Sequence, residues 1–203
     1  MLLWNTKSFL KMKRALKKAR SAVQKMKLLT NDIHNYLELY DVGIKKELIS
    51  PKINLQDITK RIKEKIEETN AMIEIEELPT LSADPILFAR LLTNLIDNSI
   101  KFRKPGEGPV VKIKHTNINE LKNVPDHLTG MPYTIITVTD NGIGFETTDK
   151  IFELFTQLPD EVKHKGSGMG LAICKKIMEM HGGHITAKAE PGKGASFHCF
   201  FPE

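Results

Sequence analysis

Three groups of residues, in a fixed order along the chain, have the chemistry of a nucleotide site. Asn94, Asn98 and Lys101 come first, Asp140-Asn-Gly-Ile-Gly144 follows, and Gly166-Ser-Gly-Met-Gly170 comes last. Amide oxygens can hold a metal ion, a carboxylate can read a base, and a glycine loop before a helix can hold phosphates. We therefore interpret the three groups together as an ATP site.

The first group forms one stripe of a predicted helix, because its members are four and three residues apart. Mg²⁺ prefers hard oxygen ligands and takes few of them from the protein when nucleotide phosphates complete its shell, which suits the amide oxygens. Lys101 can meet a phosphate as a point charge. Solvated Asn and Lys on an exposed helix would give the same pattern, so this stripe depends on its neighbours for its interpretation.

Asp140 stands at the end of a predicted buried strand, where a carboxylate without a partner is costly. A carboxylate only accepts hydrogen bonds, so it can take the exocyclic amine of adenine and would repel the carbonyl of guanine. Gly142 and Gly144 permit positive φ and let a planar base approach the backbone. Taken alone, the segment would be an Asn-Gly hairpin turn.

The third group precedes a predicted helix, whose free N–H groups and dipole favour phosphate. Ser167 adds a hydroxyl and Lys165 adds a cation. The spacing is not that of a Walker motif, and no strand lies directly before it as a dinucleotide-binding fold would require. A flexible capping loop is the alternative, and the order of all three groups argues against it.

The N-terminal part is predicted to be one coiled-coil-like helix from about residue 6 to about residue 41. Apolar residues recur there in alternating steps of three and four, at Phe9, Met12, Leu16, Ala19, Val23, Met26, Thr30, Ile33, Leu37 and Tyr40. A helix with one apolar seam cannot bury it alone, so we expect a homodimer through this helix or a missing partner helix. Residues 1–31 also hold nine Lys and Arg and no acid. A solvated helix face is favoured there over a surface for nucleic acid or anionic lipid.

The remainder is predicted to be an α+β sandwich, a mixed sheet covered by helices on one face. We expect a dimerisation helix over 1–42, a linker over 43–52 and one domain over 53–203. The predicted elements are helices over 55–69, 84–102 and 171–180, strands over 73–75, 110–115 and 134–139, an irregular insertion over 117–132, and a hairpin over 184–201. Asp84-Pro85 is a helix start, with a capping carboxylate before Pro at the first helical position.

The composition points to a cytoplasmic protein. No run approaches the roughly 18–20 apolar residues that cross a bilayer, and the N-terminus lacks the pattern of a secretory signal. Cys174 and Cys199 each have apolar neighbours and make neither a disulfide framework nor a metal spacing. We expect buried thiols in a reducing compartment.

The ordered motifs resemble those of sensor histidine kinases, in the GHKL superfamily with DNA gyrase, MutL and the heat-shock chaperone ATPases. Asn94-Leu-Ile-Asp-Asn98, Asp140 to Gly144, Ile151-Phe-Glu-Leu-Phe155 and Gly166-Ser-Gly-Met-Gly-Leu-Ala-Ile are similar to the N, first glycine, phenylalanine and second glycine boxes. The resemblance covers about residues 50–202, and Phe102-Arg-Lys-Pro-Gly with the terminal hairpin resembles the PAS-linked or hybrid type. It implies the Bergerat-type ATP-binding fold.

The resemblance also implies roles for individual residues. Asn98 would be the principal Mg²⁺ ligand, with Asn94 and Lys101 attending the phosphates, while Asp140 would read adenine with help from Gly144 through water. Phe152 and Phe155 would anchor a mobile lid. The residues implied to clamp and hinge over the phosphates are Lys165, Gly166, Ser167, Gly168, Met169, Gly170 and Leu171.

Two departures from the family pattern bear on the function. Gln157 stands near the place where many relatives have an Arg that engages phosphate or the acceptor helix. The acceptor motif of the family, His followed by Asp or Glu and shortly by Pro, does not occur at His34-Asn-Tyr-Leu, and no other His precedes the linker. The N-terminal helix resembles the second helix of a dimerisation module whose first helix is absent. We expect His34 to flank the seam as an exposed residue rather than to accept phosphate.

Asn94 favours a kinase over an ATPase. The gyrase and chaperone branches have a Glu at this place that activates water, and an amide cannot accept a proton at neutral pH. We expect a protein that positions Mg-ATP for γ-phosphoryl transfer to a histidine outside this chain, with an acceptor-histidine helix and a response regulator receiver domain as partners. The first alternative is a nonenzymatic nucleotide-dependent dimerisation switch. A nucleic-acid binder acting through the basic helix ranks below it.

Overall fold

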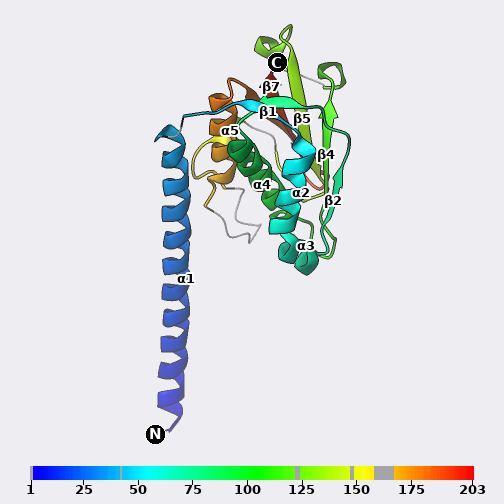
Figure 1. Cartoon of the computed structure of the whole chain (residues 1–203). Helices are drawn as coiled ribbons and strands as arrows, with labels where there is room; N and C mark the ends of the chain where they lie inside the picture. The colour runs from blue at the N-terminus through cyan, green and yellow to red at the C-terminus, as the bar shows by residue number, and fades with distance from the viewer. Residues whose placement is uncertain (1, 42, 122–123, 147–148, 158–166) are drawn as a thin grey trace.

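A long helix and a sheet covered by helices make up the computed structural model of the chain (Figure 1). The structure describes residues 2–41, 43–121, 124–146, 149–157 and 167–203. In this described part, no helix is both long and apolar enough to span a membrane.

Helix α1 (Leu2–Asp41) confirms the predicted N-terminal helix, and it extends well beyond the rest of the molecule (Figure 1). Among the described side chains, its last turns pack against the other elements. Leu39 is buried in the main core and Tyr36 packs against it, while Lys176 Nζ lies 4.0 Å from the ring centroid of Tyr40. The apolar seam before these turns is exposed, with Leu16 at 62% and Val23 at 64% of their full exposure.

Five strands form a mixed sheet in the order β2-β4-β5-β7-β6. The strands are β2 (Met72–Ile75), β4 (Val110–Thr116), β5 (Tyr133–Asp140), β6 (His184–Glu190) and β7 (Gly194–Pro202). Strand β2 runs parallel to β4, and every other pair is antiparallel. Ile113, Val138 and Phe197 are cross-strand partners in neighbouring strands, and all three are buried. Their alternation with polar residues gives the sheet one apolar face.

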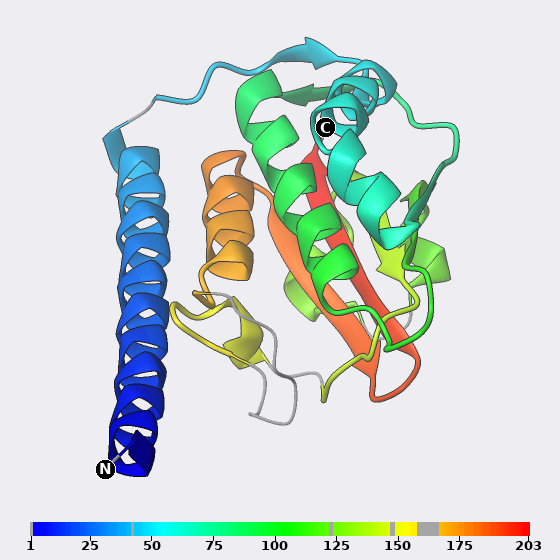
Figure 2. The ribbon, with the colours of Figure 1, turned by 90° about the horizontal axis from the view of Figure 1, so that it is seen from below.

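Helices α2 (Pro51–Arg61), α4 (Pro85–Lys101) and α5 (Gly170–Met180) lie on that face, and Figure 2 shows them side by side in front of the sheet. This confirms the predicted α+β sandwich. The predicted helix over 55–69 is two helices, α2 and α3 (Lys63–Thr69), because the backbone at Ile62 leaves the helical region at φ −101° and ψ 15°. Cys174 of α5 and Cys199 of β7 are buried free thiols, as predicted.

The predicted linker contains a strand. β1 (Glu47–Ile49) pairs antiparallel with β3 (Leu81–Ala83), which leads directly into α4. The Lys45 backbone N–H donates to Asp84 Oδ2 at 3.0 Å, and Lys46 Nζ donates to the His181 carbonyl at 2.7 Å. The Asp84 N–H in turn donates to His181 Nε2 at 3.0 Å. The segment after α1 is therefore attached to the start of α4 and to the end of α5.

The opposite face of the sheet is partly covered by the predicted insertion, which forms two short 3₁₀ helices, η1 (Ile118–Glu120) and η2 (Asp126–Leu128). Leu128 packs there in a second small core with Ile135 and Phe200.

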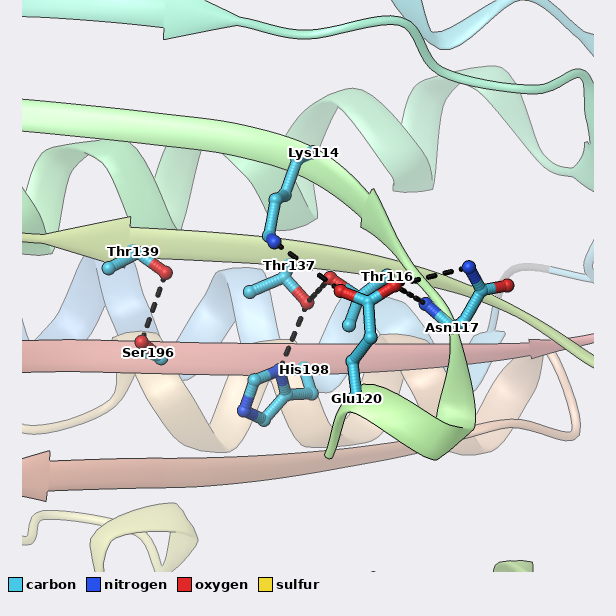
Figure 3. A network of polar contacts seen from close by, with 8 residues as sticks. All are labelled: Lys114, Thr116, Asn117, Glu120, Thr137, Thr139, Ser196 and His198. Atoms are coloured by element: carbon cyan, nitrogen blue, oxygen red, sulfur yellow. Dashed lines mark hydrogen bonds and ion pairs between the residues drawn. The ribbon is translucent and has the colours of Figure 1, made fainter. Parts of the chain in front are cut away.

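A row of hydroxyl groups crosses the same face from β4 through β5 to β7 (Figure 3). Thr116 Oγ1 donates to Thr137 Oγ1 at 2.8 Å, and Thr137 Oγ1 lies 3.0 Å from His198 Nδ1. Burial, together with the charges of Lys188 and Lys114, lowers the pKa of His198 to about 4. The imidazole in this row is therefore neutral at physiological pH.

Candidate functional site

The first residue of α4 is set by its cap. Asp84 Oδ1 accepts from the N–H groups of Ile86 and Leu87 at 3.0 and 3.1 Å, and Pro85 occupies the first turn. These contacts confirm the predicted helix start. Burial of Leu91, Leu95 and the other apolar residues of one side fixes the rotation of α4 about its axis. Asn94, Asn98 and Lys101 consequently remain half-buried along one stripe of the helix.

Asn94 presents its oxygen rather than its nitrogen outward. Its Nδ2 donates to the Arg90 carbonyl one turn back at 3.0 Å, which leaves Oδ1 facing the start of α5. A Cβ atom on Gly170 would lie 3.5 Å from Asn98 Nδ2, 3.6 Å from Asn94 Oδ1 and 3.7 Å from Asn98 Oδ1. The structure therefore brings the first and third predicted groups together, with the side-chain amides of Asn94 and Asn98 facing the N-terminus of a helix.

Lys101 continues this stripe by one turn. Its Nζ lies 4.4 Å from the ring centroid of Phe102. Burial lowers the pKa of Lys101, and the positive charge of Lys65 lowers it further. Lys65 itself is paired with Asp97 at 2.5 Å. In the part of the chain that the structure describes, Lys101 forms no salt bridge. A partly buried ammonium without an anionic partner is costly, and a phosphate would offset that cost.

Asp140 is held by three hydrogen bonds. Its Oδ1 accepts from the N–H groups of Gly142 at 2.8 Å and Ala195 at 3.2 Å, and its Oδ2 accepts from Ser99 Oγ at 3.2 Å. Burial raises the pKa of Asp140 above its ordinary value. The three donors favour the charged form and offset part of that rise. Both backbone donors bind the same oxygen, so Oδ2 keeps capacity for a further donor.

Ser99 and the Ala195 N–H are parts of this site that the motifs do not indicate. Ser99 is buried on α4 directly after Asn98, and its Oγ also lies 3.0 Å from the Leu95 carbonyl. Ala195 belongs to β7, a strand that meets Asp140 only through the sheet register. No periodicity in the sequence identifies either group.

The glycines of the second group are required by close backbone packing. A Cβ on Gly142 would come within 2.6 Å of the Phe102 carbonyl oxygen. Gly144 has φ +64°, and a Cβ there would overlap the Glu190 carbonyl oxygen. The side of each residue that a Cβ would occupy is therefore filled by protein backbone. Of these two glycines, Gly144 has a positive φ and Gly142 does not.

The third predicted group is described from Ser167 onward, and Lys165 and Gly166 lie outside the described residues. Ser167 Oγ is buried and accepts from the Met169 N–H at 3.2 Å. Gly168 has φ +78°, and a Cβ there would lie 2.5 Å from the Thr156 carbonyl oxygen. The backbone at Gly168 therefore lies close to the segment that carries Phe152 and Phe155.

The two phenylalanines of the predicted lid have different environments. Phe152, at the end of η3 (Asp149–Phe152), packs against the main core. Phe155 has φ +62° and 51% exposure, and Leu154 beside it is 42% exposed. A left-handed backbone at a bulky residue costs on the order of 1 kcal/mol or more. Phe155, the second expected anchor, is thus about half exposed among the residues that the structure describes. Leu171, the second residue of α5, is half-buried.

His34 lies on the exposed part of α1. Its side chain is 73% exposed, and its Nε2 lies 3.1 Å from Glu38 Oε1 one turn later. The side chain of Gln157 is also exposed, at the end of a described segment.

Comparison with known proteins places these motifs in a family. Residues 83–203 match the family model of the histidine kinase-, DNA gyrase B- and HSP90-like ATPases. The chain is 33% identical over 186 residues to cyanobacterial phytochrome A of Nostoc sp., covering 91% of this chain and 23% of that protein. It is 31% identical over 188 residues to the alginate biosynthesis sensor protein KinB of Pseudomonas aeruginosa, covering 89% of this chain and 29% of KinB. The chain spans less than a third of the length of these two relatives.

Solved structures share the fold. Full-length ShkA in complex with AMPPNP has a TM-score of 0.65 at 24% identity, over 88% of this chain and 37% of ShkA. The catalytic domain of histidine kinase ThkA has a TM-score of 0.59 at 24% identity, over 78% of this chain and 97% of that domain.

Proposed function

Because the chain belongs to the family of histidine kinase-, DNA gyrase B- and HSP90-like ATPases, we propose that it is the ATP-binding catalytic part of a two-component sensor histidine kinase. One observation carries the proposal. Consecutive residues of α4 touch the other two motif groups, since Asn98 faces Gly170 and Ser99 donates to Asp140. One helix thus joins a base-reading carboxylate to a phosphate-binding helix start.

Adenine is held at the Asp140 end. Oδ1 is occupied by two backbone donors, so Oδ2 takes the exocyclic amine of the base beside Ser99. Guanine presents a carbonyl at that place, which a carboxylate repels. ATP is therefore preferred over GTP.

The triphosphate lies at the other end, between α4 and the start of α5. Mg²⁺ would fit the donors there, because the side-chain amides of Asn94 and Asn98 both face the Gly170 position and amide oxygens are hard ligands. Asn98 is the principal ligand and Asn94 supports it. A bound Mg²⁺ ion would neutralise part of the negative charge on the phosphate oxygens. Lys101, Ser167 and the N–H groups at the start of α5 orient the phosphate oxygens.

The reaction is γ-phosphoryl transfer to an imidazole nitrogen. The nitrogen forms a bond to the γ-phosphorus, the bond to the bridging β–γ oxygen breaks, and ADP leaves. A neutral imidazole already has the lone pair that attacks, so the site needs alignment and charge neutralisation rather than a strong base. Asn94 stands where a hydrolase would need a proton acceptor, which an amide does not supply.

The acceptor histidine comes from outside this chain, on a helix that pairs with α1, and the phosphoryl group then passes to the receiver domain of a response regulator. His34 is not assigned as the acceptor, because it lacks the acidic residue and proline of the family's acceptor motif. ATP as substrate and two buried free thiols favour the cytoplasm.

Incubation with γ-labelled ATP tests this function. The chain alone should bind Mg-ATP with negligible self-labelling, and it should label a separate fragment that carries an acceptor helix. A variant with Asp140 replaced by Asn serves as the control and should label that fragment much more slowly when ATP is below saturation. An acid-labile label on His34 would contradict the assignment of the acceptor.

A nonenzymatic dimerisation switch is the second candidate, favoured by the exposed seam of α1. The large exposed apolar residues on it are Phe9, Met12, Leu16, Val23, Met26, Ile33, Leu37 and Tyr40. We propose that the seam pairs in parallel with a second copy. Sedimentation should show a dimer whose population rises with protein concentration. A switch would bind ATP and dimerise but would never label the acceptor fragment, which separates it from a kinase.

A further inference from the structure

The sheet face that points away from α4 and α5 changes character along its strands. At one end, Ile135 and Phe200 pair across β5 and β7 and are buried with Leu128 of the insertion. Further along the same strands, the cross-strand partners on this face are polar. Figure 3 shows those of β5 and β7. We call the whole set the polar platform, which consists of Thr137, Thr139, Thr186, Lys188, Ser196 and His198.

The hydrogen bonds of the platform fix the tautomer of His198. Thr116 Oγ1 donates to Thr137 Oγ1 at 2.8 Å, and Thr137 Oγ1 lies 3.0 Å from His198 Nδ1. Thr137 is buried, so its own proton needs an acceptor, and Nδ1 is the partner that remains among the described atoms. The proton of the neutral imidazole therefore lies on Nε2. The ring is only half-buried, and Nε2 has no hydrogen-bond partner in the part of the chain that the structure describes.

A second donor lies two residues along β5 and β7. Thr139 Oγ1 and Ser196 Oγ are 3.0 Å apart, and both residues are half-buried. Two hydroxyl groups carry two protons, and the bond between them uses one. The other proton is left to donate to a ligand above the sheet.

Two lysines flank the imidazole. Burial lowers the pKa of His198 to about 4, and the charges of Lys188 and Lys114 lower it as well, so both ammonium groups lie near the ring. Lys188 is exposed on β6 and forms no salt bridge with a residue that the structure describes. A cation and an imidazole N–H thus stand side by side without an acceptor.

The acids around the platform already have partners. Glu190 forms a salt bridge with Lys193 at 2.6 Å. Glu120 Oε1 accepts from the Asn117 N–H at 3.2 Å and from its Nδ2 at 3.1 Å, and Oε2 lies 3.7 Å from Lys114 Nζ. The platform itself contains no carboxylate. It is therefore rich in donors and positively charged.

We propose that the polar platform binds an oxyanion, a phosphate group, over His198. The Nε2–H, the remaining hydroxyl proton and the Lys188 ammonium donate to its oxygens, and Lys114 adds a second positive charge. A metal ion does not fit, because the outward imidazole nitrogen carries a proton and the platform has no carboxylate. An apolar ligand would leave these donors without acceptors. A phosphate group fits better than a carboxylate, because it has three acceptor oxygens and close to two negative charges near neutral pH.

This site is separate from the proposed nucleotide site, because α4 and α5 lie on the opposite face of the sheet (Figure 2). The proposal therefore does not rest on the proposed function. The phosphate group can belong to inorganic phosphate or to a phosphorylated side chain, and the two sources are distinguished by experiment.

NMR of the full chain with ¹⁵N-labelled histidine tests the site. The imidazole shifts of His198 should first show the proton on Nε2. Titration with inorganic phosphate should then move these signals to saturation, with a dissociation constant on the order of 1 mM. The bound anion favours the imidazolium, so it should raise the pKa of His198 from about 4. A proton on Nδ1 would overturn the proposal, as would a shift that sodium chloride of equal ionic strength reproduces.

Two variants with the same change of net charge locate the effect. Lys188→Gln should weaken phosphate binding at His198 by about threefold to fivefold. Lys63→Gln removes an exposed lysine of α3 that lies 3.6 Å from Glu67, and should leave the titration unchanged. Circular dichroism should be the same for both variants, because both lysines are exposed. Equal weakening in the two variants would overturn the proposal.

A phosphoserine peptide and the same peptide with serine identify the source of the phosphate. Saturation of the His198 shift by the phosphoserine peptide below the phosphate concentration, with no shift from the serine peptide, supports a phosphorylated side chain as the ligand. Saturation by inorganic phosphate at the lower concentration supports a free ion. The absence of a saturable shift with either probe would overturn the proposal. Calorimetry with ATP is read separately, so a failure of the proposed function would leave this result standing.

Discussion

The Ser99 hydroxyl donates to Asp140 Oδ2 at 3.2 Å, across the gap between α4 and the end of β5. This bond favours the ionised carboxylate, while burial raises the pKa of Asp140. The ionised carboxylate only accepts hydrogen bonds, so either oxygen can accept from the adenine amine. Protonation turns one oxygen into a donor, which the amine would repel. Nucleotide binding is therefore linked to the protonation of one buried acid.

Replacing Ser99 with Ala should make ATP binding more sensitive to acid. Loss of the donor raises the pKa of Asp140 further, so the fall in affinity on lowering the pH should begin at a higher pH than in the unmodified chain. Calorimetric titration with ATP between about pH 5 and pH 8 measures this. Thr93→Ala removes another hydroxyl of α4, one bonded to the Ala89 carbonyl, and should leave the profile in place. Identical profiles for all three proteins would contradict the linkage.

Replacing Asp140 with Asn should lower ATP affinity on the order of ten- to hundredfold. The Asn oxygen can still accept from the Gly142 and Ala195 N–H groups, but the amide nitrogen then faces the adenine amine as a second donor. Calorimetry measures the affinity, and thermal unfolding checks that the fold survives. Undiminished affinity in a folded variant would remove Asp140 from the site.

Gly170 and Gly144 should respond in opposite ways to replacement by Ala. At Gly170 a Cβ makes ordinary contacts of 3.5–3.7 Å with the Asn94 and Asn98 amides, so the free energy of unfolding should hold or rise by up to about 1 kcal/mol. The added methyl occupies the space of a phosphate, so Mg-ATP affinity should fall by about tenfold or more.

At Gly144 the Cβ overlaps the Glu190 carbonyl and the φ is +64°, so the variant should lose more than about 2 kcal/mol of stability. Chemical denaturation and ATP titration of both variants measure the contrast. A Gly170→Ala variant with full affinity would show that the phosphates lie elsewhere.

Replacing His198 with Gln should flatten the dependence of stability on pH. The pKa of His198 is about 4 in the folded chain, below its ordinary value near 6.5, so the unfolded chain binds the extra proton first. The free energy of unfolding that depends on a neutral His198 is fully present above about pH 6.5. As the pH falls toward 4, the free energy of unfolding decreases by on the order of 2 kcal/mol. Urea denaturation across this range checks the slope. His34→Gln, at an exposed residue of α1, is the matched control and should leave the slope unchanged.

Long elements with a clear period were predictable from the sequence. The cap Asp84 with Pro85 marked the start of α4, and the apolar repeat marked α1. β1 and β3 were missed because three residues are too few to show alternation, and each is a strand only by pairing with the other. The break at Ile62 was missed because the apolar spacing continues through it.

The candidate site was predictable where chemistry depends on local spacing. Asn94 and Asn98 had to share one side of a helix, and Asp140 had to end a strand. The partners of Asp140 were not predictable, because Ser99 and Ala195 reach it only through the packing of α4 on the sheet and the register of β7. The packing role of Gly144 likewise depends on the position of the distant Glu190 carbonyl.

The hydrogen bond from the Lys45 backbone to Asp84 and the pairing of β1 with β3 hold the segment that follows α1 against the rest of the domain. The segment after α1 is therefore attached to the start of α4 by backbone contacts at Lys45 and along β1. Because Asn94 and Asn98 lie on α4, a displacement of residues 45–49 would also move the two amides that face the start of α5.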